Sequence, residues 1–379
     1  MKKVIIALHP IEKGIPNYNE LIESFEIVNY SLTTPEKFEI DMKLKPYNEA
    51  VAIFGSYPGF KPFNGLIDHK IIDSLPSNLE IIGLCSAGFD GYDLSYLKLK
   101  NIKLCNVPVN KLIAMDVADC ALWHVLSGIR KFNSWDKYIK NDSLNNSNNN
   151  NNSHTLKIRD IVRNNYVIDS EKEKGFAFGH IYHGTSTRSS LTKKCLILGY
   201  GLIGKSVVDR MSVLGMEINV LVRDKSKYND SRVNFYSSKL DSDILKASSG
   251  IDVIIICLPG GSETYHCVNK KILDNLNENS IIVNIGRGSC IDVEALRTAI
   301  ESGKVSHVGL DVFDKEPVIE NYYLDESYIN ENSNKFFTST ITPHLGSSTL
   351  DTLECATYEC IKNIINGLNT GEYSNIVNT

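Results

Sequence analysis

Short runs of consecutive apolar residues recur along the chain and alternate with segments whose apolar positions have helical spacing. Runs that are apolar at successive positions are typical of parallel strands covered on both faces. Strands are predicted, in chain order, at residues 4–8, 51–55, 79–84, 102–106, 194–198, 218–222, 253–257, 281–285 and 308–312. Helical spacing predicts helices at residues 117–132, 205–214 and 350–368. Alternating strands and helices indicate an α/β protein with parallel sheets.

One polar segment interrupts this alternation. The composition changes at Asn141, residues 145–152 are almost entirely Asn, and turn-prone residues continue to about Lys174. Such a tract cannot bury enough apolar surface to order itself. We expect a disordered insertion at about 141–174. It does not mark a domain boundary, because strand and helix patterns resume beyond it.

Composition narrows the class of protein. The chain has 379 residues, which suits two domains, and its 42% hydrophobic and 22% charged residues are typical of soluble globular proteins. The net charge of -5 argues against nucleic-acid or anionic-membrane partners. No stretch approaches the roughly 18–20 uninterrupted apolar residues of a membrane span. The N-terminal apolar run is too short for a targeting segment, so we expect a cytoplasmic protein.

The nine cysteines include no C-x-x-C pair, and Cys195 and Cys257 lie inside predicted strands. This pattern favours small buried side chains in a reducing compartment over a disulfide framework or a zinc site. We expect no bound metal.

A glycine-rich turn follows the strand predicted at 194–198. Gly199, Gly201 and Gly204, with Leu202 and Ile203 between the last two, fit G-x-G-x-x-G and open the next predicted helix. The first glycine allows a tight turn, the second allows backbone to approach a pyrophosphate, and the third allows helix to pack on strand. The helix N-terminus adds donors and partial positive charge. In this context the motif predicts a dinucleotide-binding domain.

The end of the next strand bears on the choice of dinucleotide. NAD sites usually place an acidic residue there, roughly 20 residues after the glycines. Here Val222 is followed by Arg223, whose guanidinium could pair with the 2′-phosphate of NADP. The alternative is that Arg223 is a solvated surface residue and Asp224 binds the ribose of NAD. We favour NADP(H) over NAD(H).

Three later segments place chemically complementary residues at predicted strand ends, where ligands bind in doubly wound sheets. Arg287 could hold the carboxylate of a 2-keto acid and polarise its ketone. His344 could give a proton to the developing alkoxide, or remove one in the reverse direction. Glu316 could hydrogen-bond His344 and orient its ring. Each residue alone has an ordinary structural explanation, but their order after a dinucleotide turn favours hydride transfer at C2 of a small 2-hydroxy or 2-keto acid.

From about Val51 to the C-terminus, the chain resembles the D-isomer-specific 2-hydroxyacid dehydrogenase family, which includes glyoxylate/hydroxypyruvate reductases. The most specific stretches are LGYGLIG (198–204), VNIGRGSCIDVEAL (283–296), VGLDVFDKEP (308–317) and TPHLGSST (342–349). By resemblance, Arg287, Glu316 and His344 are the catalytic residues. The complete set argues against the alternative from another class, a dinucleotide-sensing interaction protein of the corepressor type on the same fold.

The resemblance also implies binding residues. Asp311 matches an acid near the nicotinamide carboxamide, and Leu258, Pro259 and Ile285 match positions beside the cofactor. The loop Ser86-Ala87-Gly88 matches the one that, with Arg287, receives the substrate carboxylate.

The implied fold has two Rossmann-like domains, a dinucleotide-binding domain inserted into a discontinuous flavodoxin-like substrate domain. We expect the substrate domain at 1–112 and 344–379 and the dinucleotide domain at 113–343. A homodimer is expected, with glyoxylate or hydroxypyruvate as the leading substrate class.

Overall fold

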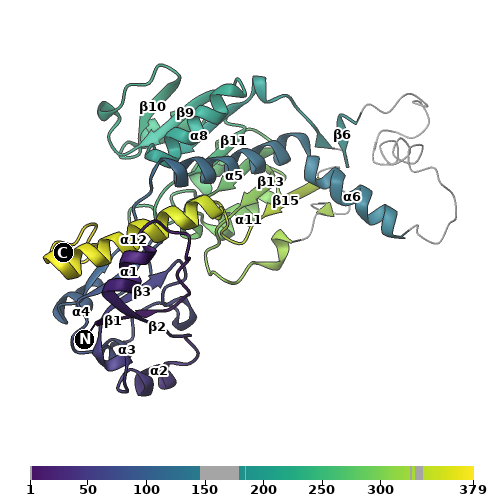
Figure 1. The fold of residues 1–379 in the computed structure, drawn as a ribbon. Helices are drawn as coiled ribbons and strands as arrows, with labels where there is room; N and C mark the ends of the chain where they lie inside the picture. Colours follow the sequence, from purple (N-terminus) through teal and green to yellow (C-terminus); the bar gives the residue numbers. More distant parts are fainter. Residues whose placement is uncertain (1, 146–178, 184, 325–326, 329–335) are drawn as a thin grey trace, which may run out of the picture. The chain divides into compact units, whose positions relative to one another are not determined.

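The computed structural model describes residues 2–145, 179–183, 185–324, 327–328 and 336–379. The chain divides into two compact units, Met1–Asn110 with Ser348–Thr379, and Lys111–Ser347. Figure 1 shows the N-terminal strands and the C-terminal helix α12 (Leu350–Thr370) in the same unit. The domain boundaries expected from the sequence, after residues 112 and 343, stay a prediction.

The first unit is built on a five-stranded parallel sheet in the order β2-β1-β3-β4-β5. Numbered along the chain, this is the 2-1-3-4-5 order of flavodoxin-like folds. The strands are β1 (Lys3–Ala7), β2 (Phe25–Asn29), β3 (Ala50–Ser56), β4 (Ile81–Leu84) and β5 (Lys103–Cys105).

Helices cover both faces of this sheet. Successive residues of a strand point to opposite sides, so each strand contributes apolar side chains to both faces. Ile6 packs with side chains of α2 (Pro35–Asp41), α3 (His69–Ser74) and α4 (Leu94–Leu99). Its neighbour Ile5 packs with α1 (Tyr18–Ser24) and with Ile361 and Ile364 of α12. The C-terminal helix therefore completes the core of the N-terminal unit, which makes this unit discontinuous in sequence.

The second unit has an eight-stranded sheet in the order β10-β9-β8-β11-β12-β13-β15-β14. The first seven strands are parallel, and only β14 pairs antiparallel among the described strands of this sheet. Along the chain their order begins 3-2-1-4-5-6, which is the Rossmann order. The strands are β8 (Lys194–Leu198), β9 (Glu217–Val222), β10 (Val233–Ser237), β11 (Val253–Ile256), β12 (Ser280–Asn284), β13 (Val305–Leu310), β14 (Ser327–Tyr328) and β15 (Phe336–Ile341).

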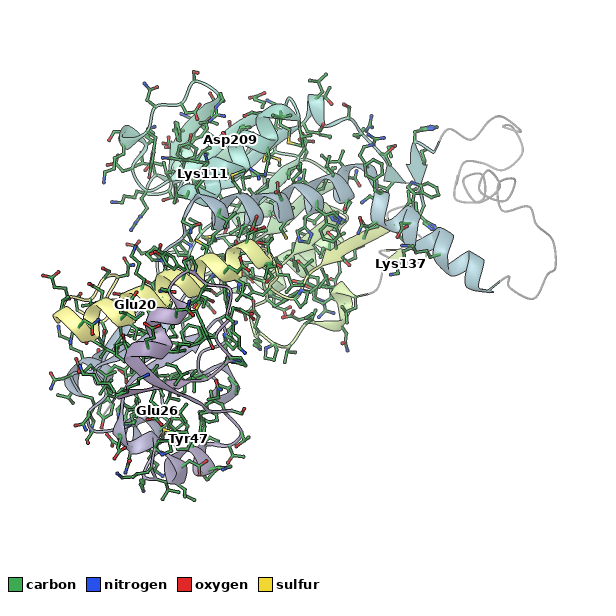
Figure 2. The ribbon with its side chains drawn as sticks, in the orientation of Figure 1. Glu20, Glu26, Tyr47, Lys111, Lys137 and Asp209 are labelled. Carbon is green, nitrogen blue, oxygen red and sulfur yellow. The ribbon has the colours of Figure 1, made fainter. Side chains whose placement is uncertain are left out.

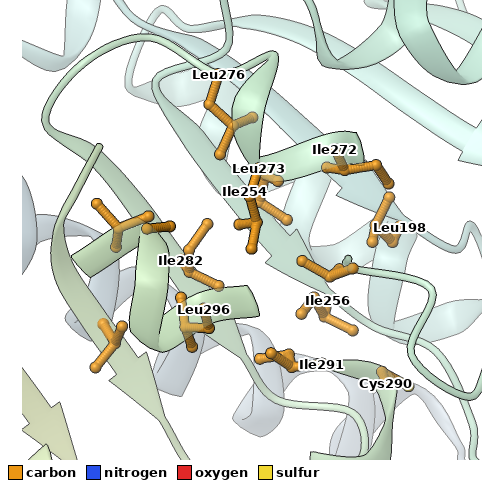
Figure 3. Packing of buried hydrophobic residues seen from close by; sticks show 14 of the residues in the cluster. Leu198, Ile254, Ile256, Ile272, Leu273, Leu276, Ile282, Cys290, Ile291 and Leu296 are labelled. Atoms are coloured by element: carbon orange, nitrogen blue, oxygen red, sulfur yellow. The ribbon is translucent and has the colours of Figure 1, made fainter. Parts of the chain in front are cut away.

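One face of this sheet packs on α9 (Asp241–Ser248), α10 (Lys270–Asp274) and α11 (Val293–Glu301). Figure 3 shows this apolar cluster, in which Ile254 and Ile256 of β11 contribute alternate residues beside Leu273 and Leu296. The other face carries α5 (Lys111–Arg130), which also packs on α8 (Leu202–Val213). The exposed residues of α8 include charged side chains. Its Asp209, labelled in Figure 2, pairs with a surface arginine.

Two glycines allow α5 to lie close to the sheet. A Cβ added to Gly309 of β13 would lie 2.5 Å from Cβ of His124. A Cβ added to Gly128 of α5 would lie 2.6 Å from Cδ2 of His307. By length and composition alone, α5 could also cross a membrane, which the sequence analysis did not anticipate. This is weak evidence, because about half of its most apolar window is buried inside the unit, as in the core helix of many folded domains.

The predicted α/β fold with parallel sheets in two Rossmann-like units is confirmed, but some elements differ from the predictions. Strands β2, β10 and β15 were not predicted, because their sequences mix polar and apolar residues. Helix α6 (Phe132–Asn145) continues past the point at which the disordered insertion was expected to begin, so that start was wrong. The remainder of the expected insertion, from residue 146, lies outside the described residues. All nine cysteines are free thiols.

Gly309→Ala should destabilise the second unit by about 1–3 kcal/mol, because the added methyl group overpacks the contact with α5. Chemical denaturation of the unliganded protein measures this change. Gly14→Ala is the control, because a Cβ there meets no atom within 4 Å. Equal stability of the two variants would show that α5 does not lie this close to β13.

Candidate active site

The glycine turn joins β8 to α8 at the carboxyl edge of the second sheet. Gly199 has φ of +97°, a conformation that side chains rarely adopt, and a Cβ on Gly204 would lie 2.3 Å from the carbonyl oxygen of Gly199. A Cβ on Gly201 would meet nothing within 4 Å, and Leu202 is exposed beside it. No side chain caps α8, so the amides of its first turn face this open space. The turn therefore fits the pyrophosphate of a nicotinamide dinucleotide.

The two residues considered for reading the adenosine ribose lie just beyond β9. The guanidinium of Arg223 is exposed, and its Nη1 lies 2.9 Å from Oε2 of Glu263, which comes from the loop after β11. Asp224 accepts hydrogen bonds from the amide and hydroxyl of Ser226, and mainly the hydroxyl bond lowers the pKa of its carboxyl. Sequence reasoning missed Glu263, because nothing in a single sequence indicates that it pairs with a residue 40 positions earlier.

The loop after β11 links the glycine turn to the next strand end. Cδ2 of Leu258 lies 3.1 Å from the position of a Cβ on Gly199. The carbonyl oxygen of Leu258 lies 2.5 Å from the position of a Cβ on Gly286. The carbonyl of the exposed Pro259 accepts a hydrogen bond from Thr264. The glycine turn, Leu258 and Pro259 were all expected to lie beside the cofactor. They form one continuous edge of the second unit.

Arg287 follows β12 in a turn that Asn284 holds. The side-chain amide of Asn284 donates to the carbonyl of Arg287 at 2.8 Å, and its oxygen accepts from the amide of Gly286 at 3.0 Å. Asn284 is fully buried, and Ile285 in the same turn is also buried, whereas Arg287 is half-buried. Asn284 was not predicted to be a site residue, although its motif position beside Arg287 could have indicated it.

Glu316 and His344, which are 28 residues apart in sequence, form a hydrogen-bonded pair. Nδ1 of His344 lies 2.9 Å from Oε2 of Glu316, and both side chains are partly exposed. The other oxygen of Glu316 accepts from the amide of Phe313 at 3.2 Å. Because the ionised carboxylate can only accept, Nδ1 of His344 carries the hydrogen and Nε2 is left to exchange a proton.

The segments carrying these residues follow three adjacent strands, β12, β13 and β15. A Cβ on Gly288, next to Arg287, would lie 1.9 Å from the carbonyl carbon of Phe313. The turn of Arg287 is therefore packed against the segment that bears Glu316. The structure brings Glu316 and His344 into direct contact and places the turn of Arg287 beside them.

Asp311 shapes the loop that carries His344. Its side chain is almost fully buried, with 2% exposed. One carboxylate oxygen accepts from the hydroxyl of Thr342 at 2.6 Å and from the amide of Leu345 at 2.7 Å, and the other accepts from the amide of Gly346 at 2.9 Å. Its carbonyl accepts from the amide of His344 at 2.8 Å. Most acceptor positions of Asp311 are thus used by the loop that carries His344. The role of Asp311 beside a nicotinamide carboxamide stays a prediction.

The expected substrate-carboxylate loop belongs to the first unit, at the carboxyl end of β4. The hydroxyl of Ser86 donates to the carbonyl of Gly88 at 2.8 Å, and the side-chain amide of Asn106 donates to the carbonyl of Ala87 at 2.7 Å. All three loop residues are partly exposed. Their role in binding substrate stays a prediction.

A Rossmann-ordered sheet, a glycine turn with open space before a helix N-terminus, and an arginine beside a His–Glu pair define a nicotinamide-dependent oxidoreductase. The turn has the geometry to accept phosphates, and the strand-end residues have the chemistry to hold an anion and exchange a proton.

Comparisons with known proteins identify the family. The model of the D-isomer specific 2-hydroxyacid dehydrogenase NAD-binding domain matches residues 158–346. A Saccharomyces cerevisiae protein with the provisional name 2-hydroxyacid dehydrogenase is 35% identical over 349 residues, covering 88% of this chain and 84% of that protein. A glyoxylate/hydroxypyruvate reductase of Arabidopsis thaliana is 25% identical, covering 88% and 86% of the two chains. The crystal structure of a glyoxylate reductase from Paecilomyes thermophila shares the fold, with a TM-score of 0.73, 23% identity and coverage of 99% and 98%.

The chain belongs to the D-isomer-specific 2-hydroxyacid dehydrogenase family, as the resemblance of its motifs indicated. It is an NAD(P)-dependent enzyme of that family.

Two glycine variants should separate the fold of the phosphate-binding turn from its function. Gly204→Ala places a methyl group against backbone and should destabilise the unliganded protein by about 1–3 kcal/mol. Gly201→Ala should destabilise it less, by about 0.5–1 kcal/mol, because alanine is a poorer helix N-cap than glycine. It should nevertheless weaken dinucleotide binding by roughly tenfold or more, because the methyl group occupies the space expected for the pyrophosphate. Denaturation and fluorescence titration measure the two effects. Undiminished dinucleotide binding by Gly201→Ala would remove this turn from the cofactor site.

Proposed function

We propose that this enzyme reduces a small 2-keto acid of the glyoxylate/hydroxypyruvate class to the D-2-hydroxy acid, with His344 as the acid and base. The observation that carries this proposal is the 2.9 Å hydrogen bond between His344 and Glu316 at the edge where Arg287 also lies. The name of the Arabidopsis relative supports the substrate class.

The chemistry needs two changes at the ketone. A bound nicotinamide dinucleotide supplies the hydride that forms the new bond at C2. The guanidinium of Arg287 binds the carboxylate of the keto acid and draws electron density toward the ketone oxygen. As the C=O π bond breaks, its electron pair passes to oxygen, and Nε2 of His344 gives its proton to that oxygen. Glu316 holds Nδ1 throughout, so that the ring presents the same nitrogen in both directions.

NADPH is the cofactor that we propose for this enzyme, with Arg223 pairing with the 2′-phosphate. The existing partner of Arg223 is Glu263, and both side chains are more than 70% exposed. Exposed ion pairs contribute little, typically about 0–1 kcal/mol. A phosphate dianion can therefore compete with Glu263 for the guanidinium, and Glu263 would act against NADPH binding.

The proposal extends to the setting in which the enzyme works. We propose a homodimer in the cytoplasm, on the basis of the family resemblance and of the composition of the chain.

Variants of the three catalytic residues should have different kinetic signatures. His344→Ala should lower kcat by about 10²–10⁴-fold without changing dinucleotide affinity, because it removes the proton donor. Glu316→Gln should lower kcat less. Arg287→Ala should raise KM for the keto acid and lower kcat, because it acts on both substrate and transition state. Steady-state kinetics and dinucleotide titration measure these constants.

The control for Arg287→Ala is Arg297→Ala, since Arg297 is an exposed arginine of α11 that pairs only on the surface with Glu301. Arg297→Ala should leave kcat and KM unchanged. A His344→Ala enzyme with normal kcat would exclude His344 as the acid and base.

Loss of nicotinamide absorbance tests the proposed reaction directly, with NADPH and NADH each combined with glyoxylate, hydroxypyruvate, pyruvate and phenylpyruvate. We expect turnover with glyoxylate or hydroxypyruvate and a preference for NADPH. Arg223→Asp should reduce kcat/KM for NADPH by roughly 10–100-fold relative to NADH, as expected for loss of a charge-assisted pair. Glu263→Gln should shift the preference toward NADPH. If the NADPH/NADH ratio of Arg223→Asp equals that of the wild type, Arg223 does not contact the 2′-phosphate. If no keto acid is turned over while dinucleotide binds, the proposed substrate class is wrong.

A further inference from the structure

A line of polar side chains crosses the interior of the second unit between α5 and β15. Threonines at alternate positions 338, 340 and 342 point to the same side of β15 and its extension. His124 of α5 and His307 of β13 lie against them, and both histidines are at most 1% exposed. The close approach of α5 at Gly128 and Gly309 brings these groups within hydrogen-bonding distance.

Six hydrogen bonds join these groups into what we term the His–Thr chain. Thr338 Oγ1 lies 2.7 Å from Nζ of Lys131 and 2.8 Å from Nδ1 of His307. Thr340 Oγ1 lies 3.2 Å from Nε2 of His307 and 2.7 Å from Nδ1 of His124. Thr342 Oγ1 lies 3.4 Å from Nε2 of His124 and 2.6 Å from Oδ1 of Asp311. In order, the His–Thr chain is Lys131, Thr338, His307, Thr340, His124, Thr342 and Asp311.

The ends of the His–Thr chain determine the direction of every bond in it. The ammonium of Lys131 can only donate, and the carboxylate of Asp311 can only accept. Burial lowers the pKa of His124 to about 3 and holds the pKa of His307 well below its ordinary value, so both rings are neutral. A neutral imidazole donates through one nitrogen and accepts through the other. All six bonds can form together only if both histidines carry hydrogen on Nε2 and each threonine hydroxyl donates toward Asp311.

The acceptor end of the His–Thr chain holds the loop of His344. Asp311 accepts from the amides of Leu345 and Gly346 as well as from Thr342, and its carbonyl accepts from the amide of His344. His344 has φ of +57°, a left-handed backbone conformation that is strained for a residue with a side chain. These hydrogen bonds hold the backbone in that conformation, from which the His344 ring reaches Glu316.

We infer that the His–Thr chain positions the catalytic loop, and that His124, Thr340 and Thr342 are positioning residues for the reaction. The inference rests on the proposed role of His344. Neither histidine belongs to the motifs that identify the family, and both act through Asp311 rather than on substrate.

The composition of the His–Thr chain argues against a role in folding alone. Buried polar networks are expensive, and well-packed apolar residues of similar volume often give equal or greater stability. A fully satisfied network instead defines a single arrangement of the groups that it joins. Here that arrangement includes the geometry of the loop at its end.

Removal of the central hydroxyl tests this inference. Thr340→Val keeps the shape of the side chain but removes the hydroxyl that donates to Nδ1 of His124 and accepts from Nε2 of His307. We expect kcat to fall about tenfold, because small displacements of catalytic groups have large kinetic effects, with dinucleotide affinity unchanged. Exchange of the Leu345 and Gly346 amides with deuterium should quicken by roughly tenfold.

Two variants provide the controls. Thr340→Ser retains the hydroxyl and should restore wild-type kcat and amide exchange. Ser280→Ala removes another buried strand hydroxyl, which among the described residues bonds to the carbonyl of Lys304 alone, and should affect neither measurement. If Thr340→Val and Thr342→Val both retain wild-type kcat and wild-type amide exchange, the His–Thr chain does not position the loop.

A measurement on the wild-type protein avoids any loss of folding in a variant. Nitrogen-15 NMR of the imidazoles should show two neutral histidines with hydrogen on Nε2, still neutral at about pH 5, as a pKa near 3 requires for His124. An Nδ1–H tautomer at His124 or His307, or protonation of either near pH 6, would overturn the assigned direction of the His–Thr chain.

These measurements separate this inference from the proposed function. If His344→Ala is inactive while Thr340→Val retains activity and amide protection, the proposed function survives and the His–Thr chain fails. If no keto acid is reduced by the wild type, the proposed function fails. Faster exchange of the two loop amides in Thr340→Val would then still support the His–Thr chain as the determinant of loop conformation.

Discussion

The geometry of the candidate active site depends on the hydrogen bonds that the buried carboxylate of Asp311 accepts. A charge with 2% exposure must be compensated by donors, and Asp311 takes them from the hydroxyl of Thr342 and from two amides of the loop that bears His344. The loop is thereby folded back onto the end of β13, where His344 meets Glu316. Without these hydrogen bonds, the loop could adopt other backbone conformations, and the buried carboxylate would have no donors. A buried residue therefore determines the geometry of the partly exposed site.

The packing of α5 against the second sheet extends this organisation through the unit. Gly128 and Gly309 remove the side chains that would otherwise separate helix from strand. The space so gained is filled by His124 and His307, which are neutral because burial disfavours their charged forms. The apolar cluster on the opposite face of the sheet stabilises the unit and offsets the cost of burying these polar groups. One face of the sheet is packed by the apolar cluster, and the other combines the apolar residues of α5 with polar contacts that reach the catalytic loop.

The core of the first unit is completed by a helix that is distant in sequence. Its flavodoxin-like sheet needs a helix on the face of Ile5, and α12 from the far end of the chain provides it. The insertion of a complete Rossmann-ordered unit between these parts is compatible with folding, because each unit has its own buried core. Arg223 and Glu263 are exposed side chains at a strand end and in a loop, so they can be exchanged without altering either core.

The sequence by itself determined the α/β class, most parallel strands, the glycine turn and the family, because these depend on local periodicity and on motifs at short spacing. It also predicted Arg287, Glu316 and His344 as candidates, since strand-end residues of a parallel sheet gather at one edge. Only the tertiary structure decided which side chains touch. It gave the predicted pair of His344 and Glu316 its 2.9 Å contact. It also placed Glu263 on Arg223 and showed β15, whose alternating threonines gave no apolar run. It also joined His124 and His307 to those threonines, because contacts between residues distant in sequence arise from the packing of helix on sheet, which no local pattern encodes.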